Sequence, residues 1–169
     1  AILLAVAGII IVAGSAYYLV GHKKVSQQSR IRTNTQLVTG DVVRAWKGEN
    51  KVNYSIYIPK DATTTVGMNG ALVRAYEGKN LYAAVYLSYE GERGYAPEEY
   101  INRIIAPQVH VLDEGATTTI GSYTWTTAES SGSEWHVAPV MDGTWLVVVE
   151  SPKANHDRVV DTLDNLIIK

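Results

Sequence analysis

The sequence contains no cysteine and no phenylalanine among its 169 residues. The lack of cysteine excludes disulfide bonds, thiolate metal ligands and cysteine catalysis. Because phenylalanine is missing, each of the 11 tyrosines and four tryptophans combines an apolar ring with a hydrogen-bonding group, which suits half-exposed sheet faces and wet interfaces. There is also no excess of positive charge, since the formal net charge is −2. We therefore expect no nucleic-acid partner.

The charges that are present divide the chain into two parts. Residues 1–50 carry six basic and two acidic residues, whereas residues 51–169 carry nine basic and fifteen acidic ones. The content of 46% apolar and 19% charged residues is typical of a folded chain. We predict a hydrophobic helix over residues 1–24, a connector over 25–49 and an acidic α+β head domain over 50–169.

The hydrophobic part is an uncharged run from Ala1 to Gly21. Twenty helical residues span about 30 Å, which is the thickness of the hydrocarbon core of a bilayer. Tyr17 and Tyr18 lie near the end of the run, where amphipathic rings suit a membrane interface. No convincing signal-peptide cleavage site follows, and we therefore expect a transmembrane-type helix that is retained.

Small residues share one face of this predicted helix. Small side chains allow helix backbones to approach closely, so that dispersion can drive self-association. Plain anchoring in a membrane remains the alternative. The residues predicted to pack in an assembly are Ala1, Ala5, Gly8, Ser15 and Ala16, and a basic collar follows at Lys23, Lys24, Arg30 and Arg32.

The head has mostly strand-like patterns. Apolar residues alternate with polar ones from Val52 to Ile58, and Pro59 ends this strand. Residues 71–76 and 81–89 flank a turn and predict a hairpin. Pro97 begins a mid-chain helix, and Asn155 begins a terminal helix. Strands are also predicted over 109–112, 117–127, 134–140 and 144–150. The apolar stripe of the terminal helix is predicted to contain Val159, Val160, Leu163, Leu166 and Ile167.

The predicted fold class is therefore α+β. A long N-terminal hydrophobic, transmembrane-type helix would precede an antiparallel sheet of about six or seven strands, on which a mid-chain helix and a C-terminal helix pack.

The N-terminal run resembles the start of a mature type IV pilin-like subunit, with a bare apolar helix followed by a β-rich head. Ala5 stands near the position where bacterial pilins usually carry a glutamate, and archaeal pilin-like subunits commonly lack it. The resemblance implies a homopolymeric filament, in which helices stored in the membrane later pack into a core.

The head is similar to small PsbP-like domains found behind bacterial membrane anchors. The similarity rests on the strand Tyr54–Ile58 with its Pro-Lys-Asp ending, and on the last strand, Gly143–Glu150, which runs into the terminal helix. Such heads are mostly non-enzymatic, so the similarity implies a binding or assembly role and transfers no site residues.

The residues that could take part in catalysis or metal binding form no recognised motif. The four histidines, at positions 22, 110, 136 and 156, lack a ligand spacing such as His-x-x-x-His, and we expect His110 and His156 to be solvated. Ser130, Ser131 and Ser133 could be combined with His136 and Asp142 as a catalytic triad, but a loop is favoured because a nucleophile elbow is missing.

Two further motifs are also incomplete. The acidic pair Asp113-Glu114 lacks the spaced ligands of a calcium loop, and Gly67–Gly70 is too short to hold a nucleotide. The sequence therefore assigns no catalytic, cofactor-binding or metal-binding residue.

The predicted function is that of a structural subunit of an extracellular pilus-like filament, not an enzyme. Its partners would be copies of itself, and the membrane before assembly. The alternative is a single-pass, membrane-anchored extracytoplasmic binding domain without enzymatic activity. Both place the protein at the cell surface.

Overall fold

The computed structural model describes residues 34–45, 49–66, 71–89, 94–111, 113–141 and 143–169. Residues Gln36–Lys169 belong to one compact unit. The predicted apolar helix, its packing residues and the basic collar lie outside the described residues.

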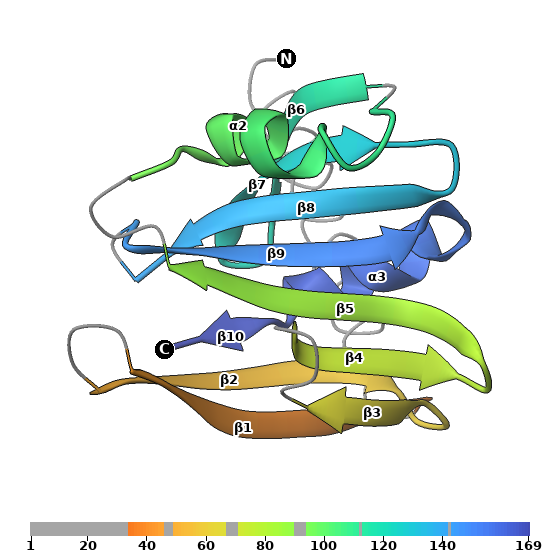
Figure 1. Ribbon diagram of the computed structural model, residues 1–169. Coiled ribbons are helices and arrows are strands. Elements are labelled where there is room, and N and C mark those ends of the chain that lie inside the picture. The colour runs from red at the N-terminus through yellow and green to blue at the C-terminus, as the bar shows by residue number, and fades with distance from the viewer. Residues whose placement is uncertain (1–33, 46–48, 67–70, 90–93, 112, 142) are drawn as a thin grey trace, which may run out of the picture. The chain divides into compact units, whose positions relative to one another are not determined.

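The larger of two antiparallel sheets has seven strands (Figure 1). The alternation of bulky β-branched and aromatic residues favours strands over most of this part of the chain. In spatial order, the strands are β3 (Thr63–Val66), β4 (Ala71–Glu77), β5 (Asn80–Tyr89), β9 (Trp145–Pro152), β8 (Ser133–Val140), β7 (Tyr123–Glu129) and β6 (Asp113–Ile120).

The smaller sheet has three strands in the order β1 (Thr35–Ala45), β2 (Glu49–Pro59) and β10 (Ile167–Ile168). Ile167 and Ile168 pair with Ser55 and Tyr54. Reciprocal backbone hydrogen bonds of 2.7 and 2.8 Å between Asn53 and Lys169 extend this pairing to the last residue.

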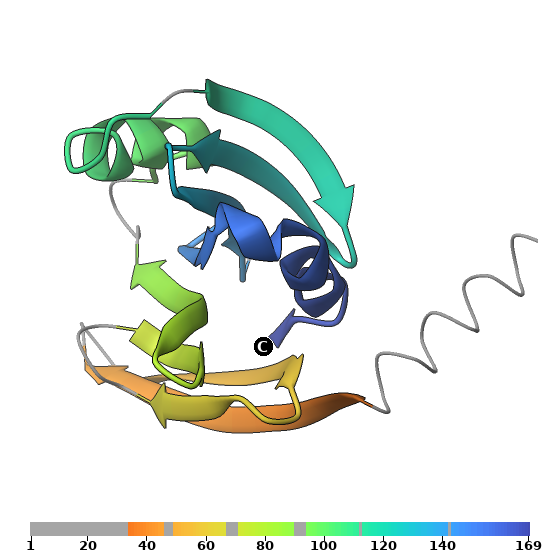
Figure 2. The ribbon, with the colours of Figure 1, turned by 90° about the vertical axis from the view of Figure 1, so that its right-hand side faces the viewer.

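The helical segments cover opposite faces of the larger sheet. The α-helix α2 (Pro97–Tyr100) continues into one π-helical turn, η2 (Ile101–Ile105), while the 3-10 turn η3 (Lys153–Asn155) leads into α3 (His156–Asp164). Figure 2 shows that the seven-stranded sheet curves around α3, with α2 and η2 on its outer side.

The central strand β9 separates two apolar cores. Val147 and Val149 belong to the main core, which also includes the apolar residues of β2 and α3, whereas Leu146 and Val148 belong to a second core with Ile101 and Ile105. Both faces of β9 are therefore covered, which explains its nearly continuous apolar sequence.

A glycine turn brings the β6–β7 hairpin against the end of α3. Gly121 has φ +60°, and a Cβ atom at this position would lie 2.5 Å from the carbonyl oxygen of Asp164. Glycine satisfies both demands because it tolerates positive φ and has no Cβ.

The predicted fold class requires correction. In the described part of the chain, no helix is both long and apolar enough to cross a membrane. The structure is mostly β-sheet with short helices, and so the α+β architecture led by a transmembrane-type helix is not what it describes. The reason is that two segments predicted to be connector or helix pair as strands instead. β1 lies within the predicted connector, residues 25–49, and β10 lies where the terminal helix was expected to continue after α3.

Three local predictions are also corrected. Residues 109–111 form no strand, and the strand predicted over 117–127 is a hairpin of β6 and β7 that turns at Gly121. The terminal helix ends at Asp164, because pairing with β2 draws Ile167 and Ile168 into a strand. The strand before Pro59 and the hairpin around Gly78 are confirmed as β2 and as β4 with β5.

Candidate functional site

The outer face of the larger sheet carries a row of residues that are far apart in the sequence. Arg74 pairs with Ala84, Ala84 with Glu150, and Glu150 with Trp135 across β4, β5, β9 and β8. Directly paired residues project to the same face of a sheet. The register therefore places a cation, a carboxylate and an indole side by side.

The helical segment α2–η2 is anchored above this row. Ile101 and Ile105 are buried against the second core, which includes Trp135. Glu98 Oε1 accepts a hydrogen bond of 3.1 Å from Thr126 Oγ1, which ties α2 to β7. Ile104 lies between the two anchoring isoleucines in the sequence and remains 36% exposed.

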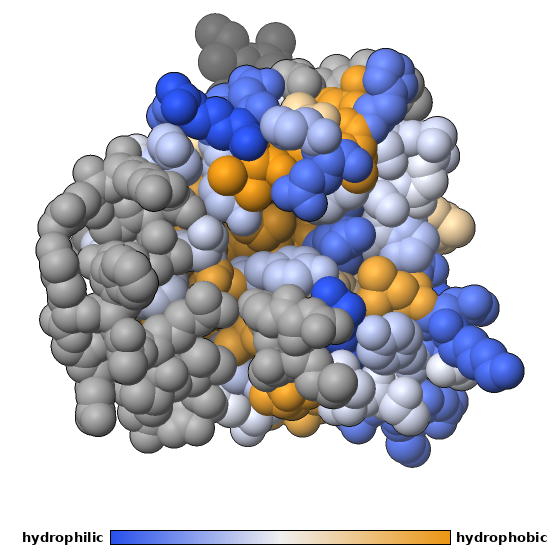
Figure 3. Space-filling model, in the orientation of Figure 1, coloured by the Kyte–Doolittle hydropathy of each residue, from blue (hydrophilic) through white to orange (hydrophobic). Residues whose placement is uncertain are grey.

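A groove of about 370 Å³ lies between this helical segment and the sheet. We call it the aromatic groove, because Tyr86, Tyr100 and Trp135 line it together with Ile104, Val148 and Glu150. Figure 3 shows apolar surface, in orange, recessed below the helical segment and bordered by hydrophilic residues. Its volume lies within the usual range for sites that bind small molecules.

One wall of the aromatic groove is polar. Tyr86 donates a hydrogen bond of 3.1 Å to Glu150 Oε2, and its hydroxyl oxygen accepts one of 3.1 Å from Arg74 Nη2. Burial, followed by the nearby Glu150 carboxylate, raises the pKa of the Tyr86 hydroxyl. The hydroxyl therefore stays protonated near neutral pH and holds the half-exposed carboxylate in place.

These groups are suited to contacting a ligand. The aromatic and aliphatic walls can contact a flat apolar group, and Glu150 can accept a hydrogen bond from an amine or amide. Neither histidine nor lysine is among the described residues that line the groove, so that Glu150 is its charged group.

The residues singled out in the sequence are placed elsewhere. Ser130 Oγ interacts with the backbone of its own loop, through Gly132 and Ser133, as expected for a loop residue. His110 is exposed and lies between η2 and β6. Asp142 and the segment 67–70 lie outside the described residues, as do the assembly residues of positions 1–33.

Sequence reasoning did not find the aromatic groove. The one hint in the sequence was that every aromatic residue is a tyrosine or a tryptophan, whose ring also carries a hydrogen-bonding group. Such residues suit half-exposed positions, but the sequence does not show which of them lie together. The structure also brings together two of the scattered histidines, His136 and His156, beside Glu134.

Comparison of the sequence with models of known protein families and with curated proteins finds no match. The resemblances to type IV pilin-like subunits and to PsbP-like heads are thus not supported, and both are corrected. The expected transmembrane helix and membrane association are corrected as well, because the described residues contain no helix suited to crossing a membrane. The first resemblance rested on one apolar run, and the second on a short strand with its Pro-Lys-Asp ending; neither pattern is specific to a family.

Proposed function

We propose that the described domain is a non-enzymatic binding module whose ligand-binding site is the aromatic groove. The observation that carries the proposal is the convergence of three aromatic rings and one hydrogen-bonded carboxylate in a single groove of about 370 Å³. A binding role is also the alternative that the sequence pattern suggests. The predicted cell-surface location and self-association stay predictions.

The composition of the groove suggests the class of ligand. Aromatic rings attract cations and flat apolar groups, and a carboxylate favours a positively charged or hydrogen-bond-donating group. Arg74 lies beyond Tyr86 and already shares its hydroxyl with Glu150. The ligand would therefore combine an apolar body with an amine or amide, as in an aromatic amine or an apolar side chain on a peptide.

Benzylamine and benzyl alcohol provide a matched pair of probes, because one is a cation at neutral pH and the other is neutral. Binding can be followed by NMR through the indole N–H of Trp135, while Trp125, buried in the main core on the other face, serves as an internal reference. We expect benzylamine to shift the Trp135 signal more strongly than benzyl alcohol does. Unchanged Trp135 signals with both probes would contradict the proposal.

Two variants test the roles of the walls. Glu150→Gln should weaken benzylamine binding about fivefold, equivalent to about 1 kcal/mol for a half-exposed charge pair, and leave benzyl alcohol unaffected. Ile104→Arg should abolish binding of both probes by filling the groove. Val66→Arg is the matched control, because Val66 is 53% exposed and lies on the edge strand β3.

A further inference from the structure

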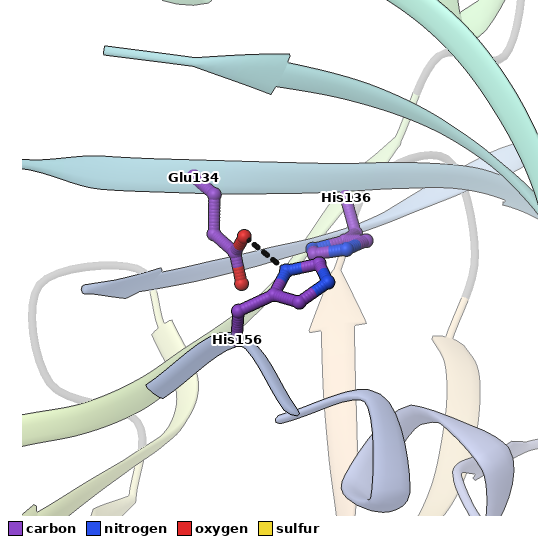
Figure 4. A group of neighbouring side chains, drawn as sticks. All are labelled: Glu134, His136 and His156. Carbon is purple, nitrogen blue, oxygen red and sulfur yellow. Dashed lines mark hydrogen bonds and ion pairs between the residues drawn. The ribbon is translucent and has the colours of Figure 1, made fainter. Parts of the chain in front are cut away.

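Three side chains of ligand type converge on the inner face of the larger sheet, opposite the aromatic groove. Glu134 and His136 are two positions apart on β8 and therefore project to the same face, while His156 begins α3. One ligand atom from each residue lies within 4.8 Å of those from the other two. Figure 4 shows the carboxylate and the two rings gathered between the strand and the helix. We call these residues the Glu–His cluster.

Glu134 is held in a fixed orientation. Its side chain is buried, and Ser151 Oγ donates a hydrogen bond of 3.0 Å to Oε1. The second oxygen, Oε2, lies 2.7 Å from His156 Nδ1. Hydrogen bonds of this kind from outside the coordination shell orient carboxylate ligands in metal sites.

His136 has a polar atom without a partner. The residue is 2% exposed, and its ring packs edge-on against Trp125 at a centroid distance of 6.2 Å. Its Nδ1 is buried and makes no hydrogen bond in the part of the chain that the structure describes. Buried polar atoms are nearly always paired, so this nitrogen points to a ligand.

His136 is also suited to coordination by its charge state. Burial is the main cause that lowers the pKa of its imidazole; the carboxylate of Glu134 opposes this shift, and the neighbouring His156 adds to it. An imidazole coordinates a metal ion in its neutral form, through the lone pair of one ring nitrogen.

His156 connects the cluster with solvent. Its side chain is 54% exposed, whereas that of Glu134 is 3% exposed. The two residues on β8 are thus rigid and enclosed, and the third can rotate. An entering ion would reach the cluster from the side of His156, and water could occupy any remaining coordination position.

We propose that Glu134, His136 and His156 bind a divalent transition-metal ion such as Zn²⁺. Metal–ligand bonds of about 2.0–2.2 Å in a tetrahedral site place the ligand atoms roughly 3.4 Å apart. The ligand atoms of the cluster already lie within 4.8 Å of one another, so that modest side-chain movements would bring them to this spacing. Imidazole ligands favour zinc, copper or nickel over calcium and magnesium, which prefer oxygen ligands.

A purely structural ion pair explains less of the geometry. His156 and Ser151 together satisfy the carboxylate of Glu134, but neither accounts for the buried Nδ1 of His136. An ion bound by His136 Nδ1 would satisfy this nitrogen and would also account for the convergence of the three side chains. The site is independent of the aromatic groove, which lies on the other face of the sheet, and either can exist without the other.

Titration calorimetry of the full chain with Zn²⁺ tests the site. We expect one ion to bind to the cluster of the unmutated chain. His156→Gln should weaken this binding at least about 100-fold, the upper end of the effect of losing an outer-shell partner, because a glutamine amide can still donate to Glu134 but is a poor ligand for zinc. His110→Gln is the matched control, since it removes an exposed imidazole that lies outside the cluster. Equal affinity of the His156→Gln variant and the unmutated chain would overturn the proposal, as would no binding by the unmutated chain.

A measurement on the unmutated chain keeps the proposal testable if the variant does not fold. Zn²⁺ should shift the imidazole resonances of His136 and His156 together, with one stoichiometric transition. The resonances of His110 and His22 should not follow that transition. Shifts confined to His110 or His22 would overturn the assignment.

Discussion

At the scale of single residues, the carboxylate of Glu134 is almost completely buried. It lies beside the imidazole rings of His136 and His156. His156 is its partner, and the hydrogen bond to Glu134 is the main cause that raises the pKa of His156, with smaller contributions from Asp157 and Glu129. Lys153 lies beside Glu129 and forms an ion pair with it. The pKa of His136, in contrast to that of His156, is lowered, mainly because burial disfavours the charged imidazole.

The raised pKa of His156 predicts a dependence of stability on pH in chelator-treated protein. Because the folded pKa lies above the unfolded value of about 6.5, the stabilisation is complete below that pH and is lost as the pH rises through the folded pKa. For an exposed imidazole, screening by solvent keeps the effect below about 1 kcal/mol. The difference in Tm between the unmutated chain and His156→Gln should thus shrink as the pH rises from about 6 to about 9.

The same comparison separates the two histidines. His136 is destabilising when protonated, so its contribution is lost as the pH falls through its lowered pKa, and it is present in both proteins. Because His156 contributes to the lowered pKa of His136, this contribution cancels only above about pH 6.5, where His136 is neutral in both proteins. A difference in Tm that grows with rising pH would contradict the assignment of the ion pair.

At the scale of elements, the C-terminal segment shows how one apolar pattern divides between two structures. Leu163 lies on α3 and is completely buried, whereas Ile167 lies on β10 and is 44% exposed. Leu166, between the two elements, is also buried. A helical stripe over all of these positions was predicted, but the helix ends at Asp164 because the last residues pair with β2.

This division predicts unequal effects of truncating the two side chains. Leu163→Ala should lower the free energy of unfolding by about 2–5 kcal/mol, because it leaves a cavity in the main core. Ile167→Ala should cost less than about 1 kcal/mol, because the side chain is partly in water. Urea denaturation monitored by circular dichroism measures both. Equal losses would mean that the terminal stripe is continuous after all.

At the scale of the whole described unit, the smaller sheet depends on strand β1, which precedes the predicted head boundary at residue 50. β1 is the neighbour of β2 in that sheet. Gln36 Nε2 also donates hydrogen bonds of 3.2 Å to Pro59 O and 2.6 Å to Ala62 O, which connect the start of β1 to the chain after β2. The domain boundaries themselves stay predictions.

A comparison of two fragments tests the contribution of β1. Residues 34–169 should unfold cooperatively, whereas residues 50–169 should have a lower Tm, because β2 becomes an unpaired edge on its β1 side. Gln36→Ala in the longer fragment should give a smaller loss, of roughly 1 kcal/mol, for its hydrogen bonds. Calorimetric melting of the three proteins provides the comparison, and identical Tm values for the two fragments would show that β1 adds no stability.

The sequence by itself determined the features that depend on neighbouring residues. Alternation before Pro59 predicted β2, and the turn residues around Gly78 predicted the β4–β5 hairpin, because period-two burial and turn conformation are local properties. The same local patterns overestimated the length of the terminal helix, since pairing with a distant strand overrode the helical pattern there.

Only the tertiary structure decided which chemically active residues meet. Arg74, Glu150 and Trp135 share one row because of the order and register of β4, β5, β9 and β8. Glu134 and His156 meet because α3 packs against the concave face of the same sheet. Strand order and helix docking are set by burial summed over the whole core, and no short stretch of sequence contains that information.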